Sequence, residues 1–172
     1  MNLLHDIDPG TKEEMNVIIE NPRNSKNKYE IKKETGVISL DRVLHTAQDY
    51  PVEYGFVPQT HWDDGDALDV ILLSTYPFSP GILVPARPVG LLKMVDGGDN
   101  DDKVLGVPAG DPRFTHIKDI TDVNAHTLKE IEHFFATYKQ IQKKEVIVSG
   151  FKGRVEAEEA FEKARKMYAD KK

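Results

Sequence analysis

The hydrophobic residues change their spacing about two thirds of the way along the chain, and this change constrains the fold more than any other feature. Met15, Val17 and Ile19 alternate with other residues, as in a strand with one buried face. From Leu128 onward, apolar residues recur at steps of three and four, which is the period of a helix. We therefore predict an α+β fold in which helices pack on a mainly antiparallel sheet.

Short apolar runs bounded by turn residues fill the first part of the chain. Tyr29 and Ile31 precede the Thr35–Gly36 turn, and residues 37–44 resume the strand pattern, which predicts a hairpin. Further strands are expected at residues 70–73, 82–84, 89–95 and 104–107. Strands this short suit a curled sheet or a small barrel. With 172 residues and no repeat or linker, we expect a single domain over residues 1–172.

Two helices are expected in the last third, with a strand at residues 145–151 between them. The first follows Asp122 and Asn124, which are good helix-starting residues, and the second follows Gly153. The predicted buried stripe of the first helix comprises Leu128, Ile131, Phe134, Phe135, Tyr138 and Ile141. That of the second comprises Val155, Ala157, Ala160, Phe161, Ala164 and Tyr168.

The acidity of the chain is concentrated in two windows of seven residues each. Residues 63–69 and 96–102 hold eight of the 16 aspartates and contain no Lys or Arg. Without those eight, the net charge of −6 becomes +2, so the rest of the chain is slightly basic. Because like charges repel, so much acid in so little chain needs a compensating partner.

Aspartates with no Cys or His beside them favour a hard, all-oxygen cation site. Asp and Gly are also common turn residues, but both windows lie at strand ends, where neighbouring loops can converge. Such a site suits Mg²⁺ or Mn²⁺, binds Ca²⁺ less tightly and suits zinc poorly. Neither window has the glycine and glutamate positions of an EF-hand. Eight carboxylates can serve more than one ion, and paired divalent ions are a common device for phosphoryl chemistry.

Cationic and phenolic side chains supply what such a metal site lacks, namely donors for phosphate oxygens. Each candidate also has a structural explanation: a strand lysine is usually solvated, a tyrosine on a helix stripe is usually in the core, and Lys139 can serve the helix dipole. Only the occurrence of all these side chains in one sequence indicates a phosphate-binding site. The candidates are Lys28, Arg42, Tyr50, Tyr54, Lys103, Tyr138 and Lys139.

These residues fall into seven segments that resemble the soluble family I inorganic pyrophosphatases of prokaryotic type, from about Val17 to Tyr168. The order and spacing of all seven agree with the family. The segments are 17–22 (VIIENP), 28–30 (KYE), 40–42 (LDR), 50–55 (YPVEYG), 64–69 (DGDALD), 93–103 (KMVDGGDNDDK) and 133–139 (HFFATYK).

The resemblance implies Mg²⁺-dependent hydrolysis of pyrophosphate to two phosphates on a five-stranded OB-like barrel flanked by helices. It implies direct in-line attack on the substrate by a metal-activated water, with Asp66 as general base. It also implies several Mg²⁺ ions in each site, for which Mn²⁺ is a possible substitute. The implied metal ligands are Asp64, Asp69, Asp96, Asp101, Glu20 and Glu30. The implied phosphate-binding residues are Lys28, Tyr54 and Lys103 for one phosphate and Arg42, Tyr138 and Lys139 for the other.

The chain departs from the family pattern at Ala67, where proline is usual. The loop that carries Asp66 and Asp69 is therefore expected to be less rigid in the unfolded chain, at a cost of about 0.4–1 kcal/mol. Asp63, Asp99 and Asp102 are expected to have supporting roles or none. The resemblance also implies a homohexamer, in which His133 is a candidate interface residue.

Composition bears on the location of the protein and on its partners. The absence of cysteine removes disulfides and thiolate chemistry and fits a reducing compartment, and the acidic N-terminus does not resemble a signal peptide, so a cytoplasmic location is expected. No run of about 18 apolar residues predicts a membrane span. The net acidity argues against nucleic acid as a partner.

Three other functions compete with pyrophosphate hydrolysis. They are an OB module for single-stranded nucleic acid, a metal-binding structural module, and a phosphatase for nucleotides or phosphate esters.

Overall fold

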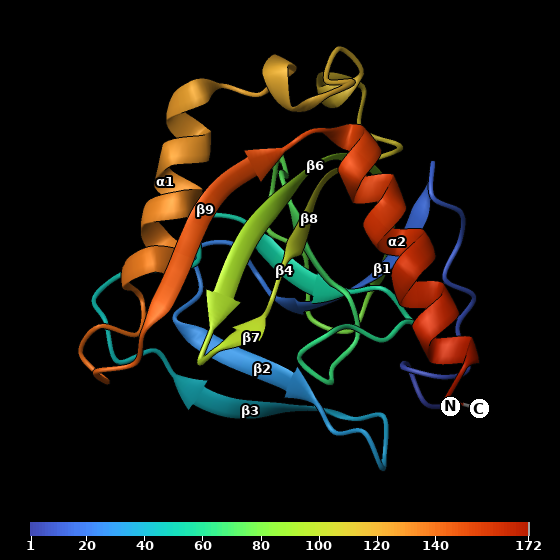
Figure 1. Ribbon diagram of the computed structural model, residues 1–172, viewed down its shortest axis with the longest axis horizontal. Coiled ribbons are helices and arrows are strands. Elements are labelled where there is room, and N and C mark those ends of the chain that lie inside the picture. Colours follow the sequence, from blue (N-terminus) through green and yellow to red (C-terminus); the bar gives the residue numbers. More distant parts are fainter. Residues whose placement is uncertain (172) are drawn as a thin grey trace.

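The computed structural model describes residues 1–171 and confirms the α+β class (Figure 1). Two short 3-10 helices, η1 (Pro112–Phe114) and η2 (Ile120–Asp122), precede the first long helix. The long helices are α1 (Ala125–Thr137) and α2 (Arg154–Ala169). The strands are β1 (Met15–Asn21), β2 (Asn27–Ile31), β3 (Ile38–Val43), β4 (Glu53–Phe56), β5 (Asp69–Leu72), β6 (Leu83–Asp96), β7 (Asp99–Asn100), β8 (Lys103–Pro108) and β9 (Val146–Lys152).

Five strands close into a ring, in the order β1–β4–β5–β8–β6 and back to β1. All pairs in this ring are antiparallel except β5–β8, which is parallel. β9 adds to β6 outside the ring, and β2 and β3 form the predicted hairpin as a separate sheet. The expected five-stranded barrel with two flanking helices is therefore confirmed.

The boundaries around β6 differ from the prediction. Residues 82–84 and 89–95 were expected to be separate strands, but a single strand spans Leu83–Asp96 and includes Pro85 and Pro88. Proline removes a donor from a strand, so it is tolerated mainly at edges and bulges. The β6–β8 register indeed shifts between Pro88 and Gly90. β6 can be long because it changes partner along its length, from β1 to β8 and then to β9.

β4 was not predicted, because Pro51 and Gly55 interrupt the apolar pattern. The structure shows why glycine stands there: a Cβ on Gly55 would lie 2.0 Å from the carbonyl oxygen of Ile18 on the neighbouring strand. The close approach of β1 and β4 thus requires glycine at this position.

The helices cover different parts of the barrel, with α1 beside β9 and α2 beside β6 (Figure 1). Asn124 caps α1 by accepting hydrogen bonds from the backbone of His126 and Thr127. The helix ends at Thr137, so Ile141 lies beyond it and is exposed, contrary to the predicted stripe. In α2, Ala157, Ala160, Phe161 and Ala164 are buried as expected, whereas Tyr168 is only partly buried and Val155 at the first turn is exposed.

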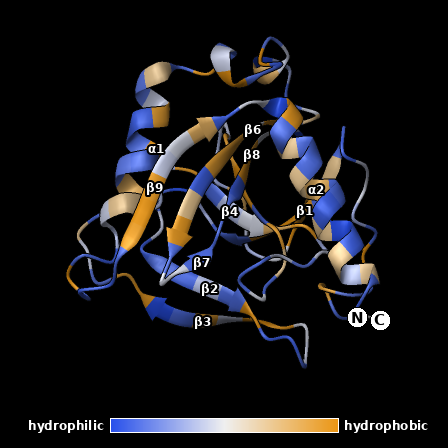
Figure 2. Cartoon of the chain, viewed as in Figure 1, coloured by the Kyte–Doolittle hydropathy of each residue, from blue (hydrophilic) through white to orange (hydrophobic). Residues whose placement is uncertain are grey.

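Strands and helices both carry hydrophobic residues among hydrophilic ones (Figure 2), and apolar residues of both kinds of element are buried. One buried group lies under α2 and includes Met15, Trp62 and Phe161. Another lies under α1 and includes Tyr50 and Phe135. None of the helices in the described part of the chain is long and apolar enough to cross a membrane.

The β2–β3 hairpin is tied to the end of β1 by side chains of β1. The Glu20 carboxylate accepts a hydrogen bond from the backbone of Ile31 at 2.9 Å, and the Asn21 side chain accepts one from the backbone of Tyr29 at 2.5 Å. These bonds fix β2, and with it Lys28 and Glu30, beside the barrel.

Candidate active site

The strand register brings the two acidic windows together. Asp69 opens β5 and Lys103 opens β8, and the two residues are partners in the parallel pair. The end of β6 reaches the same place, because Leu92 pairs with Lys103. The loops that carry the aspartates therefore leave the barrel side by side, and the predicted convergence of the windows is confirmed.

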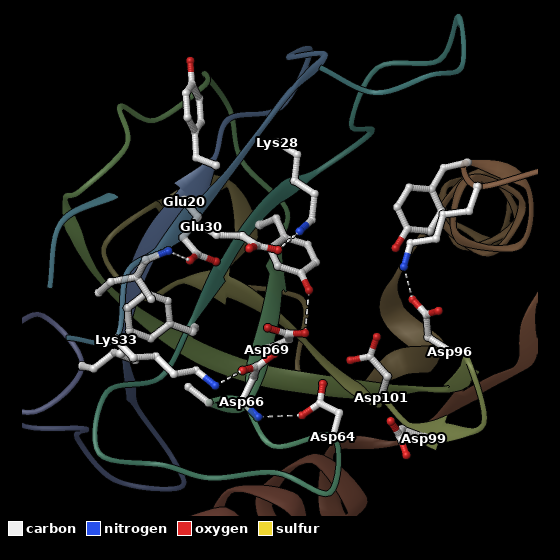
Figure 3. Close-up of a pocket in the computed structure, with 18 residues that line it drawn as sticks. Glu20, Lys28, Glu30, Lys33, Asp64, Asp66, Asp69, Asp96, Asp99 and Asp101 are labelled. Carbon is white, nitrogen blue, oxygen red and sulfur yellow. Dashed lines mark hydrogen bonds and ion pairs between the residues drawn. The ribbon is translucent and has the colours of Figure 1, made fainter. Parts of the chain in front are cut away.

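Three carboxylates meet at this end of the barrel (Figure 3). One oxygen from each of Asp64, Asp69 and Asp101 lies within 4.8 Å of the others. The first two come from one window and the third from the other. We call Asp64, Asp69 and Asp101 the aspartate cluster.

Lys103 lies against the aspartate cluster and is only 1% exposed. Its ammonium donates to Asp69 at 2.8 Å, to Asp101 at 2.9 Å and to the Tyr54 hydroxyl at 3.0 Å. The Tyr54 hydroxyl in turn donates to Asp69 at 2.5 Å. Lys103 and Tyr54 thus hold two of the three carboxylates in place.

Burial makes the ionised cluster costly despite this lysine. Burial raises the pKa of Asp69 to about 6, against the opposing effect of Lys103, and it also raises the pKa values of Asp64 and Asp101. Nearby Glu20 has its pKa raised to about 8, first by burial and then by the charge of Asp69. Burial alone would lower the pKa of Lys103, but Asp69 and Asp101 raise it, so this residue stays cationic.

The donor set fits a hard divalent cation. Carboxylate oxygens are the ligands that Mg²⁺ and Mn²⁺ prefer, and a bound cation would stabilise the ionised carboxylates against burial and mutual repulsion, which raise these pKa values. The aspartate cluster thus points to divalent metal binding.

An open cavity of about 300 Å³, which we call the acidic cavity, surrounds the cluster. Every candidate site residue except Arg42, Tyr50 and Lys103 lines it, and Tyr50 is buried in the core under α1. The lining residues are Leu4, Glu20, Lys28, Tyr29, Glu30, Ile31, Lys33, Tyr54, Phe56, Asp64, Asp66, Ala67, Asp69, Asp96, Asp99, Asp101, Tyr138 and Lys139.

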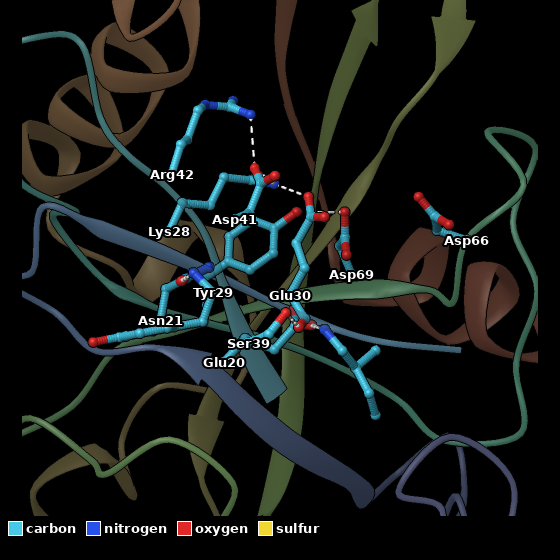
Figure 4. A network of polar contacts seen from close by, with 12 residues as sticks. Glu20, Asn21, Lys28, Tyr29, Glu30, Ser39, Asp41, Arg42, Asp66 and Asp69 are labelled. Atoms are coloured by element: carbon cyan, nitrogen blue, oxygen red, sulfur yellow. Dashed lines mark hydrogen bonds and ion pairs between the residues drawn. The ribbon is translucent and has the colours of Figure 1, made fainter. Parts of the chain in front are cut away.

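The cationic residues lie on two sides of this cavity. On the hairpin side, Lys28 pairs with Glu30 and lies 3.3 Å from Asp41, which also pairs with Arg42 at 2.8 Å (Figure 4). Just beyond the end of α1, Lys139 pairs with Asp96. Tyr138 is 5% exposed, so it packs in the core and also reaches the cavity.

Asp66 stands apart from the aspartate cluster and is exposed. Its backbone N–H donates to Asp64 at 3.0 Å, and its carboxylate pairs with Lys33 (Figure 3). It thus lies at the solvent side of the cavity, within reach of an incoming water.

The three remaining aspartates of the windows have separate positions. Asp63 turns away from the cluster and accepts hydrogen bonds from Lys163 at 2.7 Å and Asn100 at 2.8 Å. Asp102 is buried, pairs with Lys93 and accepts a bond from the backbone of Met94 at 3.2 Å. Asp99 is exposed at the rim of the acidic cavity. His133 is exposed on α1.

Two charged residues of the site were not singled out from the sequence. Asp41 bridges Lys28 and Arg42 from β3, and its place beside Arg42 on a predicted strand was an available signal. Lys33 pairs with Asp66 from the hairpin turn, but the run Lys32-Lys33-Glu34 has the pattern of any solvated turn.

Comparison with known proteins agrees with this geometry. The profile of the inorganic pyrophosphatase family matches residues 17–169. The chain belongs to the inorganic pyrophosphatase family. Pyrophosphate is the substrate of this enzyme family, and the chain is accordingly an inorganic diphosphatase.

Bacterial and archaeal members of the family are similar over most of their length. An inorganic pyrophosphatase of Synechocystis sp. is 49% identical over 138 residues, covering 80% of this chain and 82% of the relative. That of Haloferax volcanii is 43% identical and covers 99% of this chain and 98% of the relative. The crystal structure of the Thermus thermophilus pyrophosphatase superposes with a TM-score of 0.94 at 46% identity, covering 98% of this chain and 99% of that one.

Proposed function

We propose that the acidic cavity hydrolyses inorganic pyrophosphate to two phosphates with Mg²⁺, by direct in-line attack of water and with Asp66 as general base. The observation that supports this most is the aspartate cluster, in which three carboxylates from two distant windows come within 4.8 Å of one another beside cationic walls. Glu20, Glu30 and Asp96 complete the proposed metal-binding set with Asp64, Asp69 and Asp101.

Divalent ions, when bound, neutralise the substrate's charge and make water more acidic. The protein's part is to position the reactants and to accept the proton. Water attacks one phosphorus, the bond from that phosphorus to the bridging oxygen breaks, and the bridging oxygen leaves with the second phosphate. Asp66 suits the role of proton acceptor because its carboxylate is exposed at the cavity and is not one of the clustered three.

The cationic residues would hold the two phosphates. We assign Lys28, Tyr54 and Lys103 to one phosphate and Arg42, Tyr138 and Lys139 to the other. Lys28 and Lys139 already face the cavity but pair with Glu30 and Asp96, so substrate binding would exchange those partners. Were Glu30 and Asp96 to hold metal ions, both lysines would be free to donate to phosphate oxygens. No covalent intermediate is needed.

Phosphate release from pyrophosphate, ATP and a phosphomonoester, each with Mg²⁺ and with EDTA, tests the proposal. We expect fast, Mg²⁺-dependent cleavage of pyrophosphate and a loss of about 10²–10⁴-fold in kcat for Asp66→Asn. Asp63→Asn is the matched control, because Asp63 points toward Lys163 and away from the cavity. Equal rates on the three substrates would overturn the substrate assignment, and an unimpaired Asp66→Asn would overturn the base assignment.

The proposal extends to the organisation of the protein: residues 1–172 act as one domain, the chain assembles as a homohexamer, and it works in the cytoplasm. The support for the assembly and the location is the family resemblance. Sedimentation equilibrium should give the mass of six chains.

A further inference from the structure

A second cavity, of about 570 Å³, adjoins the acidic cavity. Four segments far apart in the sequence form it: the N-terminal segment, the β2–β3 turn, the loop before β5 and the C-terminal end of α2. We call it the terminal cavity, because the two ends of the chain meet there (Figure 1). Its lining residues are Leu4, His5, Asp6, Lys33, Thr60, His61, Gly65, Asp66, Ala67, Tyr168 and Lys171.

Specific contacts hold the walls of the terminal cavity together. His5 Nδ1 and the Tyr168 hydroxyl are 2.7 Å apart, and the two rings stack with their centroids 5.8 Å apart. The backbone N–H of His61 donates to Ala164 of α2 at 3.0 Å, and that of Gln59 donates to Leu4 at 2.8 Å. The cavity is therefore a defined part of the fold.

Basic side chains, namely Lys33, His61 and Lys171, gather on one side of it. The ammonium of Lys171 contacts Nε2 of His61, and neither group pairs with a carboxylate within residues 1–171. Burial and the charges of Lys171 and Lys33 lower the pKa of His61, against the opposing effect of Asp66 and Asp63, so the neutral ring is favoured and can accept from the Lys171 ammonium. The two acids of the lining already have partners, since Asp6 accepts from the backbone of Asn2 at 2.7 Å and Asp66 pairs with Lys33.

Lys33 can turn toward this cavity at little cost. Its side chain and that of Asp66 are 59% and 60% exposed, and exposed ion pairs contribute only about 0–1 kcal/mol. A doubly charged anion beside Lys171 and His61 would compete for the Lys33 ammonium.

The size of the cavity and its apolar wall indicate what kind of anion fits. At about 30 Å³ per water molecule, 570 Å³ corresponds to roughly twenty waters, far more than one phosphate displaces. Leu4 and Ala67 add apolar surface to the lining. We propose that the terminal cavity binds a phosphate ester, with its phosphate on Lys171, His61 and Lys33 and its organic body against Leu4 and Ala67.

Calorimetric titration of the full chain in EDTA tests this site without involving hydrolysis, so its failure would leave the proposed function untouched. The probes are AMP, inorganic phosphate and adenosine. We expect AMP to bind more tightly than phosphate and adenosine not to bind. Lys171→Gln should weaken AMP binding by about tenfold, since it removes a charged donor to the phosphate, and His61→Gln should do the same, since it removes the imidazole that contacts the Lys171 ammonium. Circular dichroism checks that both variants are folded.

Lys129→Gln is the control, because Lys129 is exposed on α1 and lines neither cavity. It should change AMP affinity less than twofold or so. Lys139→Gln tests the competing possibility that AMP binds in the acidic cavity, because Lys139 lines only that cavity. The proposal is overturned if AMP shows no binding at millimolar concentration, if phosphate binds as tightly as AMP, or if Lys139→Gln abolishes binding while the other two variants retain it.

Discussion

Glu20 shows how burial and neighbouring charge make a single residue responsive to pH. It is 6% exposed, and its pKa is raised to about 8 by burial and by Asp69. A carboxyl whose pKa is higher in the folded than in the unfolded protein binds its proton more tightly when folded. Between its ordinary pKa near 4.5 and about 8, the free energy of unfolding of the metal-free protein therefore falls as pH rises.

Glu20→Gln should remove this contribution, because the amide stays neutral and can still accept the hydrogen bond from Ile31. In EDTA, the parent should lose on the order of a few kcal/mol more stability than the variant between pH 5 and pH 8. Urea unfolding at both pH values measures the difference. Glu34→Gln, in the exposed hairpin turn, is the control, and parallel pH curves for the parent and Glu20→Gln would contradict the prediction.

Individual site residues differ in how well the sequence predicts them. Asp64, Asp69 and Asp101 stand in windows whose charge density is unusual, so the sequence predicts their convergence. Lys33 carries no such signal, because its contact with Asp66 depends on where a separate hairpin docks. The phosphate-binding roles of Arg42 and Lys103 were inferred from the family resemblance, and neither residue lines the acidic cavity.

At the scale of elements, the loop between β4 and β5 carries Asp64 and Asp66 and has Ala67 where the family usually has proline. Ala67 packs beside the buried side chains of Ile18 and Phe56, and its φ is not positive. Proline at a compatible position reduces the freedom of the unfolded chain.

Ala67→Pro should therefore raise the free energy of unfolding by about 0.4–1 kcal/mol. Ala67→Gly, which increases that freedom, should have the opposite effect. Denaturant unfolding in the presence of Mg²⁺ compares the three proteins. A less stable proline variant would show that the loop geometry here differs from the one proline favours.

The sequence predicts the type of most elements but not their ends. β4 was missed because Gly55 serves a close backbone approach that no periodicity reveals. β6 was predicted as two strands separated by its prolines. The pattern of a single segment does not show that the strand pairs with β1, β8 and β9 in turn and so continues past them. α1 ends at Thr137 although the apolar period continues to Ile141, since the exposed Ile141 has no core to join.

At the scale of the whole molecule, the charge distribution matters more than the net charge. The net charge of −6 is confined to two windows that the fold brings to one end of the barrel. Ions bound there would change the local field from repelling to attracting an anion. The periodicity of the sequence does not predict the closed ring, because strand pairing depends on contacts between distant parts of the chain. The expectation of a five-stranded barrel came from the family resemblance.

Mg²⁺ should raise the melting temperature, because a ligand that binds only the folded state stabilises it by mass action. At a free concentration one hundred times Kd, the gain is about 2.7 kcal/mol. Calorimetric scans with millimolar Mg²⁺ and with EDTA measure it, and Asp69→Asn should reduce the shift. A melting temperature unaffected by Mg²⁺ would argue against a preformed metal site.

The parallel β5–β8 pair has a consequence for the order of folding. Asp69 and Lys103 are 34 residues apart in the chain, so the aspartate cluster exists only after a long loop has closed. Contacts of this kind form late, because the entropy of closure is lost before they stabilise the chain. Stopped-flow measurements should then find slower unfolding with Mg²⁺ and unchanged refolding, whereas faster refolding would place the cluster in the transition state. Magnesium would thus lengthen the life of the folded enzyme without hastening its formation.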